Sequence, residues 1–497
     1  MAVARLLLAL ACLLAPAAPA SAQAAPGLDP VAYLVALLER QLNSGDQADL
    51  TPLFAPTVAP NRIEQLSRDL SMHGRIRTSV FERVRGPLEG VPDGDGYSLV
   101  VEFFIQSAGK ARIVTTGLDM QRPSGGDLQS WRFVNAEGLT SVEGLYRLRL
   151  NVTEALAARD LEITAEDLSL TLQEGTVFRV ESDDGVTGLV LIGRGEMRFS
   201  PSPLTERGQV RIFAGSDTLA SPYEAAFVRF NPLQYEHRVA TAQLIPTTAP
   251  ERTVRRAQEM FNESAPLSFS VDLQDMSRDT WHLVPPGDDF LADVDTRRFD
   301  KLTYSRAGLQ AEDISVFRRS DRRTIALYPS VAKLAARGRF YSEDASREYD
   351  VLDYHVEAAI DPVRQFIQGR ARLSMRIRTT SVSAVLLRLA EPLTVTGVTS
   401  VEYGRLLHLR LRNQNTILVS MPRALTQDSD LTLVVTYSGR LPAQDLDMDT
   451  FQIAPDAQPS TVPSDVERTY LLSNRAFWYP QNPIPDYATA TLRIIVP

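Results

Sequence analysis

The sequence predicts a mainly β protein, with an α+β domain at its N-terminal end, antiparallel sheets, and a β-sandwich or saddle at its C-terminal end. Three observations support this fold class. Short runs in which apolar and polar residues alternate recur from residue 75 onward, which is typical of half-buried strands. Apolar residues at helical spacing occur mainly before residue 71 and in one later stretch. The 497 residues allow two to four domains, because one domain usually takes roughly 100–200 residues.

Composition and charge narrow the possible function classes. The chain carries 52 basic and 61 acidic side chains, a formal net charge of −9. Domains that bind nucleic acid usually carry a basic surplus, so we expect no nucleic-acid partner. Beyond the N-terminal segment no run is apolar enough to cross a membrane, so we expect no transmembrane segment. The sequence indicates no particular oligomeric state.

Residues 1–22 have the features of a secretory signal peptide. Arg5 supplies the charged start, residues 6–15 form a short apolar run, and Ala20-Ser21-Ala22 is a typical cleavage site. Cleavage there removes Cys12, the only cysteine, so the mature protein would have neither a disulfide nor a cysteine metal ligand. We therefore expect a periplasmic or extracellular protein.

Residues 28–144 are predicted to form the α+β domain, with helices followed by a curved antiparallel sheet. Asp29-Pro30 is a helix start, because aspartate caps a first turn and proline fits the first helical position. One face of this helix carries Val31, Leu34, Val35, Leu38 and Leu42. A shorter helix is expected around Ile63, Leu66 and Leu70. Strands are expected at 75–85, 97–106, 111–120 and 131–136.

Residues 145–347 are predicted to form a β-rich accessory domain. Asp183-Asp184-Gly185 is a hairpin turn signal between two apolar runs. One helical stretch is expected at 254–261. The predicted strands lie at about 168–180, 186–192, 197–199, 210–213, 299–304, 314–319 and 324–328.

Residues 349–497 show the clearest alternation and predict the C-terminal sheet domain. Apolar residues at every second position over 371–377 alternate with polar ones, which indicates a strand with one wet face. The apolar positions of 407–411 pair naturally with those of 417–421 across a turn at 413–415. A further strand is expected over 431–437.

A succession of short motifs in this region resembles a known family. Tyr349-Asp350-Val351 leads into Tyr354-His355-Val356, followed by Ile360-Asp361-Pro362 and Gly369-Arg370-Ala371. Val435-Thr436-Tyr437-Ser438-Gly439 comes later, and Trp478-Tyr479-Pro480 precedes the strand-like run 486–497. This order and spacing is similar to the N-terminal β domain of the aminopeptidase N family of zinc metallopeptidases. The resemblance covers about the last 150 residues, the size of one domain.

The resemblance implies a gluzincin, in which H-E-x-x-H and a distant glutamate hold zinc. The motif's own glutamate activates the zinc-bound water. This chain contains no such motif, and no two of its histidines lie three to five residues apart; they are His73, His237, His282, His355 and His408. We therefore predict no catalytic residue, no metal site and no cofactor within these residues. Zinc is expected only in a catalytic domain that would follow the β domain.

In the family, the β domain helps to bind the free amino terminus of the substrate. It uses a glutamine or glutamate shortly before an arginine and an aromatic-proline turn. In this chain the corresponding positions are Asn474 and Arg475, and Gln481 stands in the turn that follows. These three residues are the candidate substrate-binding residues. The alternative for Asn474 is an ordinary loop amide, and Trp478 and Tyr479 are interpreted as core or interface aromatics.

Three charged clusters have simpler interpretations. Asp445, Asp447 and Asp449 have the spacing of the first three ligands of a calcium loop, but Thr450 replaces the required glycine. The acidic residues over 288–295 are interpreted as a solvated loop. Arginines flank the turn Ser320-Asp321; a solvated hairpin end is the preferred interpretation, and a phosphate site is the alternative. The four flanking arginines are Arg318, Arg319, Arg322 and Arg323.

Two functional hypotheses follow. The first is the N-terminal, non-catalytic part of an exported zinc metallo-aminopeptidase, framing a peptide substrate for a catalytic domain that is absent here. The second is a complete, secreted, non-enzymatic binding or scaffold protein that reuses the β domain. The parent protein in the first hypothesis is an enzyme, whereas the residues present here are expected to be inactive alone.

Overall fold

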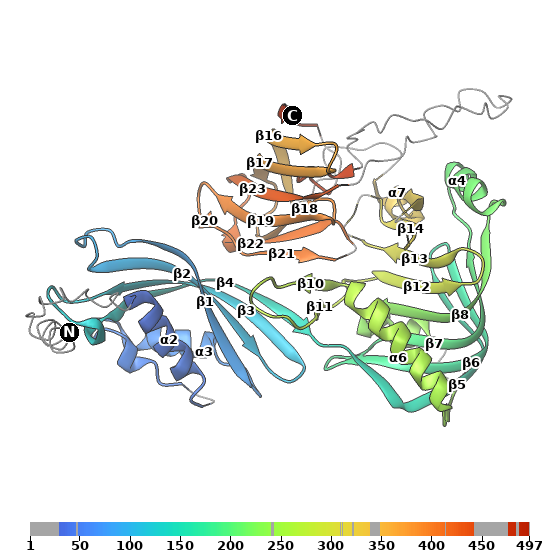
Figure 1. Ribbon diagram of the computed structural model, residues 1–497, viewed down its shortest axis with the longest axis horizontal. Coiled ribbons are helices and arrows are strands. Elements are labelled where there is room, and N and C mark those ends of the chain that lie inside the picture. The colour runs from blue at the N-terminus through green and yellow to red at the C-terminus, as the bar shows by residue number, and fades with distance from the viewer. Residues whose placement is uncertain are drawn as a thin grey trace, which may run out of the picture.

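The computed structural model describes most of the chain after residue 28. The described residues are 29–45, 48–239, 243–308, 310, 312–320, 323–337, 348–412, 414–441, 476–483 and 487–496, without the side chains of 138 and 139. The predicted signal peptide and the calcium-like aspartates at 445–449 lie outside them. Three sheets dominate the described chain, and every strand pair but one is antiparallel, which confirms the mainly β fold class (Figure 1).

The N-terminal helices lie on one face of the first sheet. Helix α2 (Pro30–Leu42) begins after Asp29, whose Oδ1 accepts a hydrogen bond from the backbone N–H of Val31 at 3.2 Å. Helix α3 (Pro60–Asp69) follows the short 3₁₀ turn η1 (Thr51–Leu53). The predicted apolar face of α2 is buried in a core shared with Phe103 and Phe133 of the sheet.

The first sheet takes strands from all three regions that the sequence separates. It begins with β1 (Arg77–Pro87), β2 (Gly96–Gln106), β3 (Lys110–Gln121) and β4 (Arg132–Tyr146), with η2 (Leu128–Ser130) between the last two. It continues through β11 (Trp281–Leu283), β10 (Ser270–Asp272), β21 (His408–Leu411), β22 (Thr416–Leu425) and β18 (Val382–Arg388). The two short central strands therefore connect the N-terminal sheet to the C-terminal sandwich.

The second sheet is built entirely from residues 149–328. Its order is β15 (Thr324–Tyr328), β14 (Ile314–Arg318), β13 (Asp300–Arg306), β12 (Phe290–Thr296), β8 (Leu219–Phe230), β7 (Gly185–Phe199), β6 (Leu168–Ser182), β5 (Arg149–Ala165) and β9 (Leu244–Thr247). The predicted turn at 183–185 joins β6 to β7, and the predicted strands 314–319 and 324–328 are confirmed.

Two helices cover opposite faces of this second sheet. Helix α6 (Glu251–Ser264), predicted over 254–261, packs through Ala257 and Met260 on one set of alternating side chains (Figure 1). Helix α4 (Leu204–Ala214) packs through Val210 and Ala214 on the other set. The shorter helical segments are η3 (Pro232–Gln234), α5 (Tyr235–Arg238), η5 (Ala265–Leu267) and α7 (Val331–Arg337). No helix in the described ranges is both long and apolar enough to cross a membrane.

The strand predicted over 210–213 is wrong, because these residues belong to α4. Val210 and Ala214 are four residues apart and are both buried, which matches a helical turn and not a two-residue repeat. Gly215 then ends the helix at a φ of 81°, a left-handed conformation that glycine adopts readily. A four-residue run with three apolar residues is too short to distinguish the two periods from the sequence.

The third sheet and the end of the first sheet form the predicted C-terminal β-sandwich. Its order is β20 (Gly404–Arg405), β19 (Leu393–Ser400), β23 (Asp430–Arg440), β17 (Phe366–Ile377), β16 (Tyr349–Asp361) and β24 (Thr489–Ile495). One core joins its inner face to Val385 of β18 and Val419 of β22. Strands β21 and β22 pair as predicted across residues 413–415, but the predicted register is wrong. Leu409 lies opposite Leu418 and His408 lies opposite Val419, so Leu407 and Leu409 face a different core from Ile417 and Val419.

Tyrosine rings lie over glycines at one place in each of the second and third sheets. A Cβ added to Gly195 of β7 would overlap the ring of Tyr223 on β8, and a Cβ on Gly369 of β17 would overlap the ring of Tyr437 on β23. Each glycine therefore leaves the space that the neighbouring ring fills.

The substitution Gly369→Ala tests this packing. We expect the new methyl group to displace the Tyr437 ring and to lower the free energy of unfolding by about 1–3 kcal/mol. Gly397→Ala is the matched control in the same sheet, because a Cβ there meets nothing within 4 Å. Urea denaturation monitored by tyrosine and tryptophan fluorescence measures both. Equal midpoints for the two variants would contradict the packing described.

Candidate functional site

The segment 476–483 lies against one end of the sandwich, and of the three predicted substrate-binding residues it contains Gln481. The backbone of Gln481 exchanges two hydrogen bonds with Arg388 of β18, at 2.8 and 2.9 Å. The side-chain nitrogen of Gln481 is buried and has no hydrogen-bond partner within the described residues. Asn474 and Arg475 lie outside the described residues, so Gln481 is the candidate whose surroundings are known.

Aromatic side chains fix this segment to the sandwich. Trp478 is buried in the sandwich core, which confirms its interpretation as a core aromatic. Tyr479 packs edge-to-face on Trp478 and on Tyr354 of β16, with ring centroids 4.8 and 5.7 Å apart. The hydroxyl of Tyr354 accepts a hydrogen bond from the backbone N–H of Asn482 at 3.1 Å. The turn is therefore held by packing on both sides of Gln481.

Arg388 links this segment to the second sheet. Its guanidinium carbon lies 3.8 Å from the centroid of the Phe477 ring, and its Nη2 donates to the side-chain oxygen of Gln310 at 3.4 Å. Gln310 in turn donates to the backbone oxygen of Gln414 at 3.1 Å. Among the described residues, the polar groups around Gln481 are amides, a guanidinium and the hydroxyl of Tyr354, which can orient a polar ligand.

The histidines described do not come together. His355 lies on β16 and His408 on β21, which confirms that both are sheet residues. His408 is buried with its Nε2 3.1 Å from the side-chain nitrogen of Gln274. Among the described residues, no group of three or more histidine, cysteine, aspartate or glutamate side chains is placed to hold a metal ion.

A buried arginine joins the second sheet to the first. Arg229 of β8 is completely buried, and it donates to the backbone oxygen and the hydroxyl of Thr187 and to the hydroxyl of Tyr146 on β4. Tyr146 donates in turn to the backbone oxygen of Leu283 at 2.9 Å. The partners of Arg229 are neutral, and burial lowers the pKa of Arg229 below its usual value.

His282 of β11 lies in the same junction. Its ring stacks on Tyr146 with centroids 6.3 Å apart, and its Nε2 lies 3.0 Å from the backbone oxygen of Ala265. Burial lowers the pKa of His282 to about 3, and the charge of Arg229 acts in the same direction. The imidazole is therefore neutral at physiological pH and serves to pack and to hydrogen-bond the junction.

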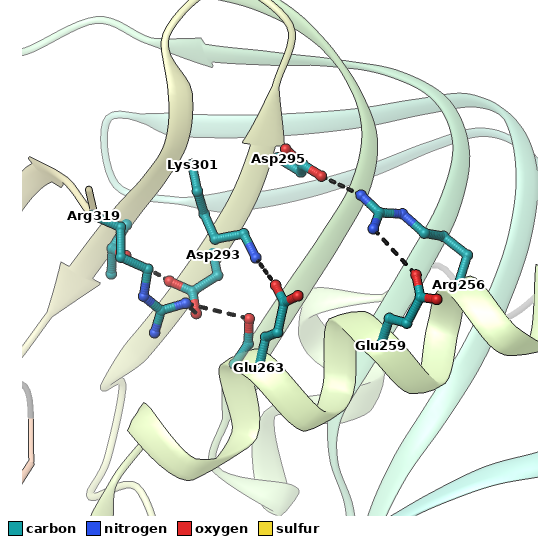
Figure 2. Close-up of polar contacts among 9 residues, drawn as sticks. Arg256, Glu259, Glu263, Asp293, Asp295, Lys301 and Arg319 are labelled. Atoms are coloured by element: carbon teal, nitrogen blue, oxygen red, sulfur yellow. Dashed lines mark hydrogen bonds and ion pairs between the residues drawn. The ribbon is translucent and has the colours of Figure 1, made fainter.

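Of the acidic residues at 288–295, Asp288 lies exposed in a turn as predicted, whereas the prediction of a solvated loop is wrong for the buried Asp289 and for Asp293 and Asp295, which lie on β12 and form ion pairs. Asp293 of β12 is fully buried; it accepts hydrogen bonds from Thr303 and, at 2.6 Å, from Arg319. Lys301 pairs with Glu263 of α6, and this contact lies beside the Arg319 pair (Figure 2). Alternation along β12 turns Asp293 and Asp295 toward α6, where basic partners meet them. Arg319 is therefore one of the basic residues that pair with acidic residues of β12.

Sequence reasoning missed one feature, a cleft along the first turns of α6. Its volume is about 830 Å³, and its walls come from α6, β7 and β8. Arg252, Arg255 and Arg256 contribute three of its basic side chains. The sequence contains the basic run Arg-Thr-Val-Arg-Arg at 252–256, but these arginines line a cleft only when the helix lies against the sheet.

Comparisons with known proteins show a limited similarity. No family model and no curated protein matches the chain. Among solved structures, the M1 zinc metallopeptidase from Deinococcus radiodurans matches at 23% identity over 31% of this chain and 33% of that chain, with a TM-score of 0.24. A mutant of that enzyme bound to a Tyr-Ser-Ala substrate matches at 21% identity over 30% and 33%, with a TM-score of 0.23.

The chain therefore spans about a third of the length of these enzymes. These TM-scores are too low to carry an argument about fold or function.

The pKa of His282 predicts how stability depends on pH. Between about pH 3 and 6.5 the unfolded imidazole binds a proton that the folded one does not, so its contribution to stability falls as the pH falls. Relative to His282→Gln, the wild-type protein should lose about 3 kcal/mol of unfolding free energy between pH 6.5 and 4. Urea denaturation at several pH values measures this difference.

The comparison between variant and wild type is necessary because Asp289 acts in the opposite direction. Burial raises the pKa of Asp289 to about 6, so its contribution to stability is complete below the unfolded value of 3.8 and is lost as the pH rises through about 6. His355→Gln is the control, because His355 is half exposed. If His282→Gln and His355→Gln have the same pH profile, the assignment to His282 is wrong.

Proposed function

We propose that this protein is the non-catalytic portion of an exported zinc metallo-aminopeptidase, in which the C-terminal sandwich frames a peptide substrate for a catalytic domain. The motif succession over 349–497 supports the proposal, because it resembles the family's N-terminal β domain in order and spacing. In this role Gln481 would offer its carboxamide oxygen to the ammonium group of the substrate's amino terminus. Zinc would reside in the catalytic domain and not among these residues.

The observation that carries the proposal is the exposed apolar strand β24. It pairs in parallel with β16 at the edge of the third sheet, from Asp353 opposite Thr489 to Ala359 opposite Ile495. Three of its apolar side chains and that of the residue after it are 46–61% exposed; they are Leu492, Ile494, Ile495 and Val496. An uncovered apolar edge strand favours association, and native proteins usually cover or charge such an edge. The proposed occupant of this surface is the catalytic domain.

The second candidate function is that of a secreted, non-enzymatic binding protein. The arginine-lined cleft favours it, because the cleft is formed by α6 and the second sheet and uses no residue of the sandwich. This function would not need a catalytic domain.

Substitutions on β24 test the proposed contact. In the product of the whole reading frame, Leu492→Ser with Ile494→Ser should reduce stability by about 2–5 kcal/mol, because two buried aliphatic side chains become polar. In a protein of residues 23–497 the same pair should change stability by less than about 0.5 kcal/mol, since these side chains are already exposed.

The matched control is Leu233→Ser with Val401→Ser, two exposed apolar residues elsewhere, which should have little effect in either protein. Differential scanning calorimetry measures all four proteins. If the β24 pair has the same small effect in both backgrounds, no domain covers this strand.

The coding DNA beyond codon 497 and an activity assay test the proposal directly. We expect an open frame that encodes H-E-x-x-H followed by a distant glutamate. The protein of residues 23–497 should contain no stoichiometric zinc and show no turnover of aminoacyl substrates. A stop codon directly after codon 497 would favour the binding protein, and chelator-sensitive turnover by residues 23–497 would refute the non-catalytic assignment.

A further inference from the structure

A cleft runs along α6 on the second sheet. Its volume of about 830 Å³ lies within the range of about 300–1,000 Å³ that is typical of sites for small molecules. Residues of β7 and β8 form its floor, the first three turns of α6 form one wall, and Arg297 stands after β12 at its margin.

The floor of the cleft is shaped by two glycines. The pairing of β7 with β8 shifts register between Ile192 and Gly195, so β7 bulges at this point. Gly193 has a φ of 153°, and a Cβ there would overlap the backbone of Glu174. Gly195 leaves the space that Tyr223 occupies. Side chains larger than hydrogen at either glycine would force this floor to move.

Basic side chains outnumber acidic ones in the lining. The five basic residues are Arg194, Arg252, Arg255, Arg256 and Arg297, and the three acidic residues are Glu196, Glu224 and Glu259. The difference, five minus three, is two positive charges.

The acidic residues in the lining already have arginine partners. Glu224 pairs with Arg297, Glu259 with Arg256 at 3.4 Å, and Glu196 with Arg198 at 3.7 Å outside the cleft. Arg256 also pairs with Asp295 (Figure 2). The pKa of Glu224 is lowered, first by its hydrogen bond from Arg297 and then by surrounding arginines.

Two arginines in the lining have no such partner. Arg194 of β7 and Arg252 of α6 form no ion pair or hydrogen bond with any side chain in the part of the chain described. Both are exposed; Arg194 belongs to the floor of the cleft and Arg252 to the wall formed by α6.

The position of the arginines on α6 is unfavourable for the helix itself. Arg252, Arg255 and Arg256 lie in its first two turns, where the helix dipole is positive and a cation is unfavourable. No side chain caps this helix end; Pro250 occupies the N-cap position. Glu251 offsets part of the charge through an exposed pair with Arg255. The ion pairs with Glu259 and Asp295 account for Arg256 within the fold, whereas Arg252 has no such pair. A bound anion would compensate Arg252 and the helix end.

We propose that this cleft binds a phosphate-bearing organic anion, held between Arg194 on β7 and Arg252 on α6. Guanidinium groups bind phosphate oxygens through two parallel N–H donors, which suits a dianionic phosphate better than a single diffuse charge. The surplus of two positive charges matches one phosphate monoester dianion. This inference does not depend on the proposed relationship to a peptidase, because none of its residues belongs to the sandwich.

Isothermal titration calorimetry on the protein of residues 23–497 tests the proposal with inorganic pyrophosphate and with glycerol 3-phosphate. We expect saturable binding that weakens at 0.5 M salt, as an arginine–phosphate contact should. Arg194→Gln with Arg252→Gln should weaken binding at least about 100-fold, since each lost charged contact is worth about tenfold. Both residues are exposed, so the melting temperature should be unchanged.

The matched control removes the same charge elsewhere. Arg159→Gln with Arg364→Gln replaces two exposed arginines, whose side chains are 78% and 84% exposed, and should leave affinity within about twofold. Flotation with phosphatidylglycerol–phosphatidylcholine vesicles distinguishes a lipid headgroup from a free phosphate compound as the ligand. If the protein binds the vesicles and the Arg194/Arg252 variant does not, the ligand is a lipid headgroup.

Three results would overturn the assignment. The first is no binding of pyrophosphate or glycerol 3-phosphate at millimolar concentration together with no binding to vesicles. The second is equal affinity of the Arg194/Arg252 variant and the wild type. The third is equal binding of citrate, which would show a general polyanion site in place of a phosphate site.

Discussion

Arg229 connects two sheets that the chain builds from separate segments. Its guanidinium is removed from water and hydrogen-bonded to Thr187 beside it on β7 and to Tyr146 at the end of β4. A buried cation without a carboxylate is stabilised only if its N–H groups find acceptors, so each contact restricts where β4 can meet the second sheet. Tyr146 donates a hydrogen bond to the backbone oxygen of Leu283, and this contact restricts the position of β11 as well. The position of the short strands β10 and β11, and of the sandwich beyond them, depends on this junction.

The sandwich is connected to the rest of the protein by shared backbone pairing. Strands β22 and β18 form one wall of the sandwich core, and β21 beside β22 extends the N-terminal sheet through β10, where Val271 pairs with Leu411. The contact of Arg388 with Gln310 adds a second link, from the sandwich to the turn between β13 and β14. Whatever binds near Gln481 is therefore placed relative to the second sheet by side chains as well as by strands.

Charge on α6 serves two different purposes along one helix. Toward its C-terminal end, Glu263 pairs with Lys301, beside the buried pair of Asp293 and Arg319 (Figure 2). Losing Arg319 would leave Asp293 charged and buried, which is costly, so this end holds the helix on the sheet. Toward its N-terminal end Arg256 pairs with Asp295 of β12, whereas Arg252 faces an open cleft and contributes little to holding the helix. The paired end positions the helix, and the basic end is available to a ligand.

Local patterns in the sequence determined many of the elements. Asp29-Pro30 and the apolar face from Val31 to Leu42 specify α2, because cap and periodicity act within a few residues. Alternation specifies β16 and β17 for the same reason, and Asp183-Asp184-Gly185 specifies the hairpin that follows β6. The prediction for 210–213 is wrong because its three apolar residues fit either period until packing decides.

Tertiary structure alone decided where these elements meet. Nothing local indicates that β10 and β11, of three residues each, join two larger sheet regions, because that pairing depends on segments more than a hundred residues apart. The burial of Asp293, which reads as a solvated acidic residue, depends on Arg319 reaching it from another strand. In the sequence, the arginines at 252–256 are typical of an ordinary charged helix face. They line a cleft only because Ala257 and Met260, on the adjacent face, pack the helix against the sheet beside the β7 bulge. The sequence by itself determined the elements, since those depend on near neighbours. The sites depend on long-range packing, which brings distant side chains together.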